Sequence, residues 1–337
     1  MKVGLVLEGG AMRGMYTADV LDVFLDNNIE VNGIIGVSAG VLFGVNYLSK
    51  QKGRVIRYNK KYCKDKRYMG MHSLITTGNI INKEFSFYEL PFKLDIFDEK
   101  TYKNSKTDFY ATVTNIETGK PEYIKVECPS EQMELFRATS AMPFVSKIVE
   151  YNGNKYLDGG IADSIPVDKC KEMGYEKIIV VLTRPVEYRK TPTNKFFASM
   201  KYKKYPKFLE TLCNRYKNYN SSVEKVIDLE NKNEIFVIRP SKFVDIKRIE
   251  RDPEKLQEMY DLGIEDAKNI LENLKEYINP QVQLSEDITL EDLLKAFQNY
   301  LERKKQQAPV TTKITTREIS VEERTRRNTW TKRKLNK

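Results

Sequence analysis

Short apolar runs alternate along this chain with segments whose apolar residues recur at helical spacing. Residues 2–7 and 177–182 have the length and composition of buried strands. Residues 253–277 instead carry apolar side chains three or four positions apart, the spacing of one face of a helix. Such alternation is typical of a parallel or mixed sheet covered by helices, so we predict an α/β fold.

Turn-forming residues mark further strands. Asn152-Gly153 supplies the positive φ angles of a two-residue turn, which predicts a β-hairpin over 149–157. Residues 109–114 and 122–126 flank another turn and are predicted to pair. A strand at 235–238 and a helix at 167–173 complete the expected elements.

The pentapeptide Gly36-Val37-Ser38-Ala39-Gly40 is the strongest chemical signal. It follows an apolar run and opens a segment of helical spacing, so Ser38 is expected on a sharp strand-to-helix turn, the position of a nucleophile elbow. Gly36 and Gly40 let the backbone turn closely, and the first amides of the helix favour negative charge beside the serine oxygen. A chance match is the alternative, and the strand-turn-helix context argues against it.

A serine hydroxyl needs a partner that accepts its proton. His72 is the only histidine, and it lies soon after Ser38, whereas α/β-hydrolases place their histidine after the acid, late in the chain order. We therefore expect His72 at the surface and a carboxylate as the base. Asp158 is the best candidate, because the predicted hairpin delivers it into Gly159-Gly160, where small residues let a substrate come close. A plain turn at Asp-Gly-Gly is the alternative.

A loop of small residues follows the first strand. Glu8-Gly9-Gly10-Ala11-Met12-Arg13-Gly14 precedes a helical pattern, and such a loop presents free backbone N–H groups to an anion. Its spacing is neither the dinucleotide-binding Gly-x-Gly-x-x-Gly nor a phosphate loop ending in Gly-Lys-Ser/Thr. An oxyanion hole for an acyl-transfer intermediate fits better.

In their order and spacing these three stretches resemble the patatin-like phospholipase family, which has a glycine-rich loop ending in Arg/Lys-Gly, then Gly-x-Ser-x-Gly, then Asp-Gly-Gly or Asp-Gly-Ala. The segments 137–143 and 162–167 also look like family segments. The resemblance covers about residues 2–185 strongly and the rest weakly. Ala11 departs from it, because many members carry a third glycine there. The alanine keeps its N–H, so the hole is weakened only if the position needs a glycine-only conformation.

The resemblance implies a three-layer patatin-like fold and a serine lipid acyl hydrolase, similar to a phospholipase A or a lysophospholipase. Ser38 would attack an ester carbonyl, and Asp158 would accept its proton in a dyad that needs no histidine. The amides of Gly9, Gly10 and Ala11 would hold the oxyanion. Arg13 would either orient the loop through an ion pair or meet a phosphate head group. Further site support is expected from Gly14, Gly36, Gly40, Gly159 and Gly160.

Composition limits the cellular setting. The four cysteines, at positions 63, 128, 170 and 213, form no Cys-x-x-Cys pair, and the first apolar run is too short for a secretion signal and is interrupted by Glu8. No apolar stretch approaches the roughly 20 residues that span a bilayer. We expect a cytoplasmic protein with reduced thiols, at most peripheral at a membrane, and neither a cofactor nor a metal. A lipid ester is the expected partner, and the oligomeric state is left open.

Two segments, 51–105 and 190–230, interrupt the α/β pattern and are rich in lysine and tyrosine. Basic side chains beside aromatic rings suit an anionic membrane interface, with each nearby cation adding about 1 kcal/mol. Helical insertions with a solvated basic face are the alternative, which we favour slightly. Under either interpretation the segments are expected to form a cap near the site.

The end of the chain differs in charge. From Glu302 onward there are twelve Lys and Arg against four Glu, so this segment supplies +8 of the net charge of +10. We predict a patatin-like domain over 1–285, followed over 286–337 by a helix near 290–304 and a disordered basic tail. Solvation of that tail is favoured over contact with anionic lipid, and nucleic acid is not a favoured partner.

Two other functions stay open at this stage. An acyltransferase or a short-chain esterase would use the same dyad, because the sequence does not say which alcohol or water molecule releases the acyl group. A non-catalytic regulator that binds lipid or phosphate would use the loop and the basic surface. It is disfavoured, because a regulator would not need both Ser38 and Asp158.

Overall fold

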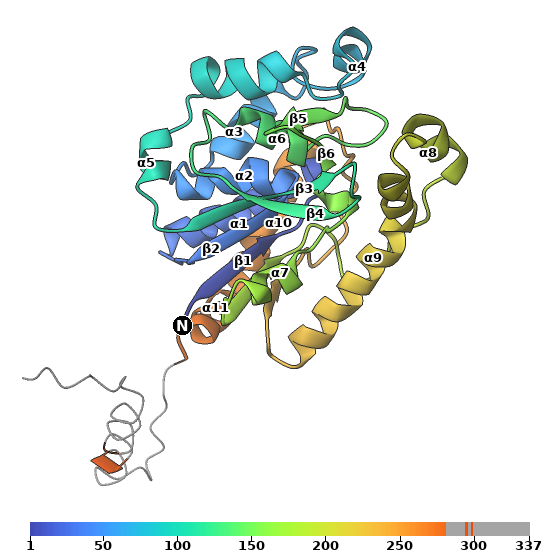
Figure 1. Ribbon diagram of the computed structural model, residues 1–337. Coiled ribbons are helices and arrows are strands. Elements are labelled where there is room, and N and C mark those ends of the chain that lie inside the picture. The colour runs from blue at the N-terminus through green and yellow to red at the C-terminus, as the bar shows by residue number, and fades with distance from the viewer. Residues whose placement is uncertain (281–293, 296–297, 299–337) are drawn as a thin grey trace, which may run out of the picture. The chain divides into compact units, whose positions relative to one another are not determined.

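The central element of the fold is a mixed sheet, drawn as arrows in Figure 1. The computed structural model describes residues 1–280, 294–295 and 298. The basic tail predicted from residue 302 and most of the helix predicted near 290–304 lie outside the described residues. The sheet and its helices belong to one compact unit, Met1–Pro280, and the boundary predicted at 285 stays a prediction.

Eight strands form this sheet within the described residues. They are β1 (Val3–Leu7), β2 (Gly33–Val37), β3 (Asp108–Asn115), β4 (Pro121–Lys125), β5 (Val149–Tyr151), β6 (Asn154–Asp158), β7 (Lys177–Val181) and β8 (Phe236–Ile238). Their order is β5-β6-β3-β2-β1-β7-β8, with β4 paired to β3. The pairs within β3-β2-β1-β7-β8 are parallel, whereas β4, β6 and β5 join antiparallel. The expected mostly parallel sheet is therefore confirmed.

Helices cover both faces of the sheet, because the parallel strands are apolar on both sides. In β1, Leu5 and Leu7 pack into one core and Val6 packs into another, as the two-residue period of a strand requires. The first core is shared with α1 (Met15–Asp26), α2 (Ala39–Leu48) and α10 (Pro253–Asn269), and the second with α7 (Val167–Glu172) and α9 (Pro206–Asn231). The result is the expected three-layer arrangement, visible in Figure 1.

The first insertion, 51–105, folds into α3 (Arg54–Tyr62), α4 (Met71–Thr77), the irregular helix η2 (Glu84–Leu94) and α5 (Glu99–Lys103). In Figure 1 these elements lie above and to the left of the sheet. The second insertion, 190–230, forms α8 (Lys195–Tyr202) and most of α9, on the right. The short helix α6 (Met133–Thr139) packs beside β3 and β5.

The hairpin over 149–157 is confirmed: Asn152 and Gly153 have φ of 47° and 76° between β5 and β6. The single helix predicted over 253–277 is wrong in one respect. Ile270, at φ −107° and ψ 3°, separates α10 from α11 (Leu271–Ile278). Apolar spacing continues across this break, so the pattern alone did not reveal it.

None of the helices in the described part of the chain combines the length and the apolar character needed to cross a bilayer.

Candidate active site

Ser38 occupies a strained turn at the carboxyl end of β2. Its φ of 54° and ψ of −118° are unusual for a residue with a side chain and cost of the order of 1–3 kcal/mol. Gly40 makes the turn possible, since a Cβ at this position would stand 2.5 Å from the Leu7 carbonyl oxygen. Gly36, the fourth residue of β2, is similarly crowded by the backbone of α2. The structure thus brings both predicted glycines to the elbow.

A threonine fixes the backbone of Ser38. The Ser38 N–H donates to Thr139 Oγ1 at 3.0 Å, and that hydroxyl donates to the Thr112 carbonyl oxygen at 2.7 Å. Both threonines are fully buried, so this pair of hydrogen bonds ties the elbow to β3 and α6 without competition from water.

Asp158 lies against the serine. Ser38 Oγ donates to Asp158 Oδ2 at 2.8 Å, and the Gly160 N–H donates to Asp158 Oδ1 at 2.8 Å. Antiparallel pairing of β6 with β3 sets Asp158 opposite Val113. Gly159 and Gly160 begin a short 3-10 helix, η3 (Gly159–Ile161), and a Cβ on Gly159 would stand 2.1 Å from the Thr112 carbonyl oxygen. Serine and carboxylate are thus held in contact by the sheet.

The carboxyl of Asp158 is almost wholly shielded from solvent. Burial raises its pKa above the ordinary value of 3.8, and this effect is opposed by the Arg215 charge, by the hydrogen bonds from Ser38 and Gly160, and by the Lys190 charge. A carboxyl with a raised pKa is a stronger base than an exposed one and is suited to accept a proton from a hydroxyl.

The glycine-rich loop passes beside Ser38. An added Cβ at Gly9 would stand 3.0 Å from the Cβ of Ser38. The N–H groups of Gly9, Gly10 and Ala11 donate to no acceptor among the described residues. Free amides beside a serine hydroxyl are what the predicted oxyanion hole requires. Ala11 has φ 50°, a conformation that favours glycine, so the sequence departure at this position carries backbone strain.

Arg13 and Gly14 belong to the next turn, η1 (Ala11–Gly14), which leads into α1. Arg13 is buried, and its Nη1 donates to the Ile246 carbonyl oxygen at 3.0 Å. Burial, reinforced by the nearby Arg184 and Arg248, lowers the pKa of Arg13 to about 10. Arg13 forms no ion pair with any described residue, and so the ion-pair interpretation of this residue finds no support.

His72 lies exposed on α4 and lines neither of the two cavities that contain Ser38. The structure therefore brings Asp158, and not His72, to the serine.

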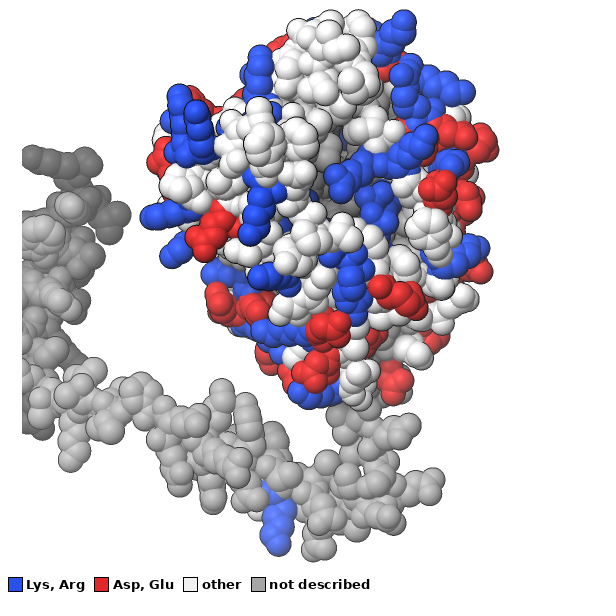
Figure 2. Space-filling model, turned by 90° about the vertical axis from the view of Figure 1, so that its right-hand side faces the viewer, with Lys and Arg blue, Asp and Glu red and all other residues white. Residues whose placement is uncertain are grey.

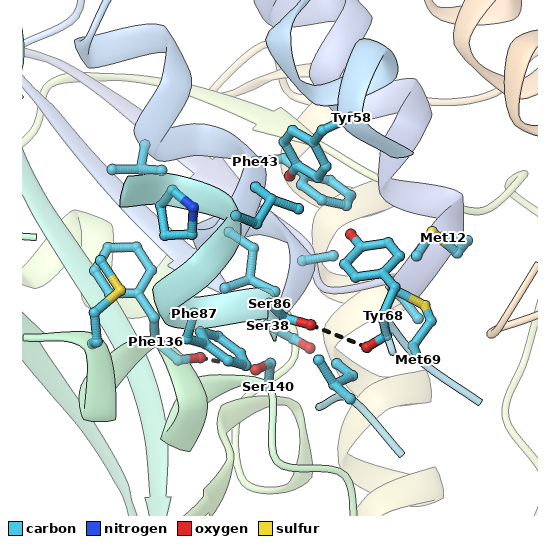
Figure 3. A pocket seen from close by; sticks show the side chains of 18 of the residues that line it. Met12, Ser38, Phe43, Tyr58, Tyr68, Met69, Ser86, Phe87, Phe136 and Ser140 are labelled. Carbon is cyan, nitrogen blue, oxygen red and sulfur yellow. Dashed lines mark hydrogen bonds between the residues drawn. The ribbon is translucent and has the colours of Figure 1, made fainter. Parts of the chain in front are cut away.

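One cavity at Ser38 is apolar, with a volume of about 110 Å³. Figure 3 shows Ser38 among the aromatic side chains of Phe43, Tyr58, Tyr68 and Phe87. The rings of Tyr58, Tyr68 and Phe87 come from the first insertion, 51–105, which therefore covers the site as expected. Such a lining suits a fatty acyl chain.

A second cavity, of about 490 Å³, also includes Ser38 and Asp158. Its wall combines apolar side chains with several charged ones, and for these charges we call it the polar cavity. Lys190 and Arg215, from the second insertion, lie in its wall. Arg215 Nε donates to the Gly160 carbonyl oxygen at 2.6 Å, which connects this wall to the loop after Asp158. Sequence reasoning gave no role to either cation, because no local motif marks them. Thr139 lies in the family-like segment 137–143, but only the fold shows that it contacts Ser38.

Two parts of the chain match known protein families. Residues 5–170 match the family model described as patatin-like phospholipase. These residues form a patatin-like phospholipase domain. Domains of this kind are lipid ester hydrolases. Every residue predicted for the site lies within residues 5–170. A second model, described only as a domain of unknown function (DUF6363), matches residues 205–279, and residues 171–204 lie between the two matches.

Several curated proteins are similar to the chain. The uncharacterized protein YjjU of Escherichia coli is 27% identical over 278 residues, which are 78% of this chain and 75% of that protein. Lysophospholipase nte1 of Aspergillus fumigatus is 28% identical over 189 residues, 53% of this chain but 12% of that protein. The probable lipid hydrolase 463L of Invertebrate iridescent virus 6 is 27% identical over 184 residues, 49% of this chain and 61% of that protein. The chain thus spans only a small part of the lysophospholipase.

The role of Thr139 is testable. In Thr139→Val the Ser38 N–H and the Thr112 carbonyl oxygen lose their partner while staying buried, which should lower the free energy of unfolding by about 1–3 kcal/mol. Thr139→Ser keeps the hydroxyl and should retain most of this stability. Urea unfolding of both variants measures the difference, and equal midpoints for the two would contradict a role for the hydroxyl.

Proposed function

We propose that the patatin-like domain cleaves fatty-acyl esters of phospholipids or lysophospholipids through an acyl-enzyme on Ser38. The observation that carries this proposal is the 2.8 Å hydrogen bond between Ser38 Oγ and Asp158 Oδ2, at a strained elbow between an apolar and a polar cavity. The names of the lysophospholipase and lipid hydrolase relatives agree with a lipid substrate.

In the first half of the reaction, Asp158 takes the hydroxyl proton as Ser38 Oγ attacks the ester carbonyl carbon. The carbonyl oxygen becomes an oxyanion that accepts hydrogen bonds from the amides of Gly9, Gly10 and Ala11. Breaking of the ester C–O bond then releases the alcohol, which takes the proton back from Asp158. Ser38 is left esterified with the acyl group.

In the second half, Asp158 accepts a proton from water as the water oxygen attacks the acyl carbon. The same amides stabilise the second oxyanion, and the fatty acid leaves as Ser38 regains its proton. If an alcohol replaces water, the same residues catalyse acyl transfer. The polar cavity beside Asp158 gives water access to this step and favours hydrolysis.

We further propose that α8 brings the site to a membrane surface. Phe196, Phe197 and Met200 are 68%, 61% and 64% exposed on this lysine-rich helix. The helix contacts the rim of the polar cavity, where Tyr202 Oη accepts a hydrogen bond from the Phe144 N–H at 3.0 Å. Exposed rings beside cations suit an anionic lipid interface. A lipid drawn from that interface would enter close to Ser38.

The dyad is tested by Ser38→Ala and Asp158→Asn. Each should lower kcat/KM on p-nitrophenyl butyrate by at least about 10³-fold, and the double variant should be little worse, because the two residues act in one step. A fluorophosphonate probe should label wild-type protein and not Ser38→Ala. Retained turnover in both single variants would exclude the dyad.

The pH dependence identifies the base. Asp158 must be ionised to accept a proton, so kcat/KM should fall on acidification through a pKa above 3.8. His72→Ala should leave the acid limb of the pH–rate profile unchanged, whereas disappearance of the limb in this variant would assign the base to His72.

The raised pKa of Asp158 also predicts a change in stability. Above that pKa the ionised carboxylate disfavours the folded state, so Asp158→Asn should have a higher Tm than wild type in thermal unfolding at pH 7.

Membrane contact is tested by replacing both exposed rings, Phe196→Ser with Phe197→Ser. Binding to vesicles that contain anionic lipid should weaken about tenfold or more, because the change removes two large apolar side chains from the interface. Phe92→Ser, an exposed ring on η2, is the matched control. Equal vesicle binding by wild type and the double variant would rule out α8 as the contact.

A further inference from the structure

The polar cavity at Ser38 is lined by five cationic side chains. They are Arg13, Arg184, Lys190, Arg215 and Arg248. Its acidic side chains, Glu8 and Asp158, are fewer. Figure 2 views the side of the molecule that carries α8 and α9 and shows Lys and Arg side chains around a hollow in its upper half.

The five cations have no carboxylate partner in the described part of the chain: none lies within the 4.0 Å of an ion pair. The oxygens of Glu8 accept hydrogen bonds from the Thr183 N–H at 2.7 Å and from Tyr219 Oη at 2.8 Å, and its charge offsets those of Arg13 and Lys190 only in part. Asp158 is engaged by Ser38 and Gly160. The Nε of buried Arg13 has no acceptor at all among the described residues.

Aromatic rings and a hydroxyl hold two of these cations, Arg184 and Lys190, in place. Arg184 lies 4.1 Å from the ring centroid of Tyr188, and Lys190 lies 3.4 Å from that of Tyr219. The two rings meet edge to face at 6.0 Å. Lys190 Nζ also donates to Ser164 Oγ at 3.2 Å. These contacts orient the cations without cancelling their charge.

Like charges placed close together raise the free energy of the folded state, and a bound anion would lower it. Burial first, and then the charge of Arg215, lowers the pKa of Lys190 well below its ordinary value. The lowered pKa of Arg13 has the same two kinds of cause, burial and neighbouring arginines. A bound anion would favour the charged form of both groups.

We propose that this cavity binds the phosphate of the substrate, so that the enzyme selects glycerophospholipids and lysophospholipids over neutral esters. The inference rests on the proposed function of Ser38. With the acyl chain in the apolar cavity and the carbonyl at Ser38, the leaving alcohol projects into the polar cavity, and in a glycerophospholipid that alcohol carries the phosphate. Guanidinium groups bind phosphate oxygens through paired N–H donors.

The proposal also gives the second matched segment a role. Arg184, Lys190, Arg215 and Arg248 all lie outside the patatin-like domain, and the last two belong to the domain of unknown function at 205–279. That segment would thus supply the head-group side of an active site whose nucleophile and base come from the patatin-like domain.

The kinetic test uses Arg184→Gln with Arg248→Gln, because neither side chain donates a hydrogen bond to another described residue. We expect the ratio of kcat/KM on dihexanoylphosphatidylcholine to kcat/KM on p-nitrophenyl butyrate to fall about tenfold or more, the effect of losing charged hydrogen bonds to the phosphate. The matched control, Arg189→Gln with Arg251→Gln, removes two arginines near these in sequence that line neither cavity. Its ratio should equal that of the wild type, and an unchanged ratio in the first pair would overturn the proposal.

A binding test separates this inference from the proposed catalysis. In Ser38→Ala, sn-glycerol 3-phosphate should bind in calorimetry and glycerol should not, and adding the Arg184 and Arg248 changes should weaken binding about tenfold. Absence of binding would overturn the phosphate site. Binding of inorganic phosphate as tight as that of glycerol 3-phosphate would assign the cavity to free phosphate and overturn the head-group role. Glycerol 3-phosphate binding alongside a wild-type protein without esterase activity would uphold the site and reject the proposed reaction.

Discussion

The buried hydrogen bond between Ser38 and Asp158 is the interaction on which the rest of the site depends. It requires a serine at the carboxyl end of β2 and a carboxylate at the end of β6, with β3 between the two strands. Because β6 runs antiparallel to β3, the chain enters the site at Asp158 and turns away at once through Gly159 and Gly160. A one-residue slip of β6 would turn Asp158 to the other face of the sheet, so the register of this short strand determines whether a dyad exists.

Keeping a carboxylate buried beside a hydroxyl is costly, and the surrounding structure offsets the cost. The Gly160 N–H contributes directly, and the charges of Arg215 and Lys190 favour the ionised form of Asp158. Both cations come from outside the patatin-like domain. The candidate dyad therefore depends electrostatically on residues beyond the patatin-like domain, although its reacting groups lie within that domain.

Local sequence predicted the parts of the site that are local in the chain. The elbow at Ser38, the glycine-rich loop and the hairpin before Asp158 are each specified by a few adjacent residues whose backbone demands can be read directly. Arg215 and Lys190 carry no such signal, because a lysine or an arginine in a helical insertion looks the same whether it faces water or a cavity. The strain at Ala11 was also invisible, since a sequence shows that an alanine is present but not that its φ is positive.

Polar contacts between α1 and α10 help to hold Arg248 in place relative to the dyad. Tyr16 donates to Asp266 at 3.1 Å, and the Ile264 N–H donates to Asp19 at 3.0 Å, between two helices that bury apolar residues on the same side of the sheet. Gly263 allows the close approach, since a Cβ there would stand 2.6 Å from the Tyr16 carbonyl oxygen. Because α1 directly follows the glycine-rich loop, and the segment leading into α10 carries Arg248, these contacts help to fix one wall of the polar cavity against the other. The segment at 205–279 is thus packed as part of the same core as the patatin-like domain, which is the condition for a cation on one segment to act on a substrate bound at the other.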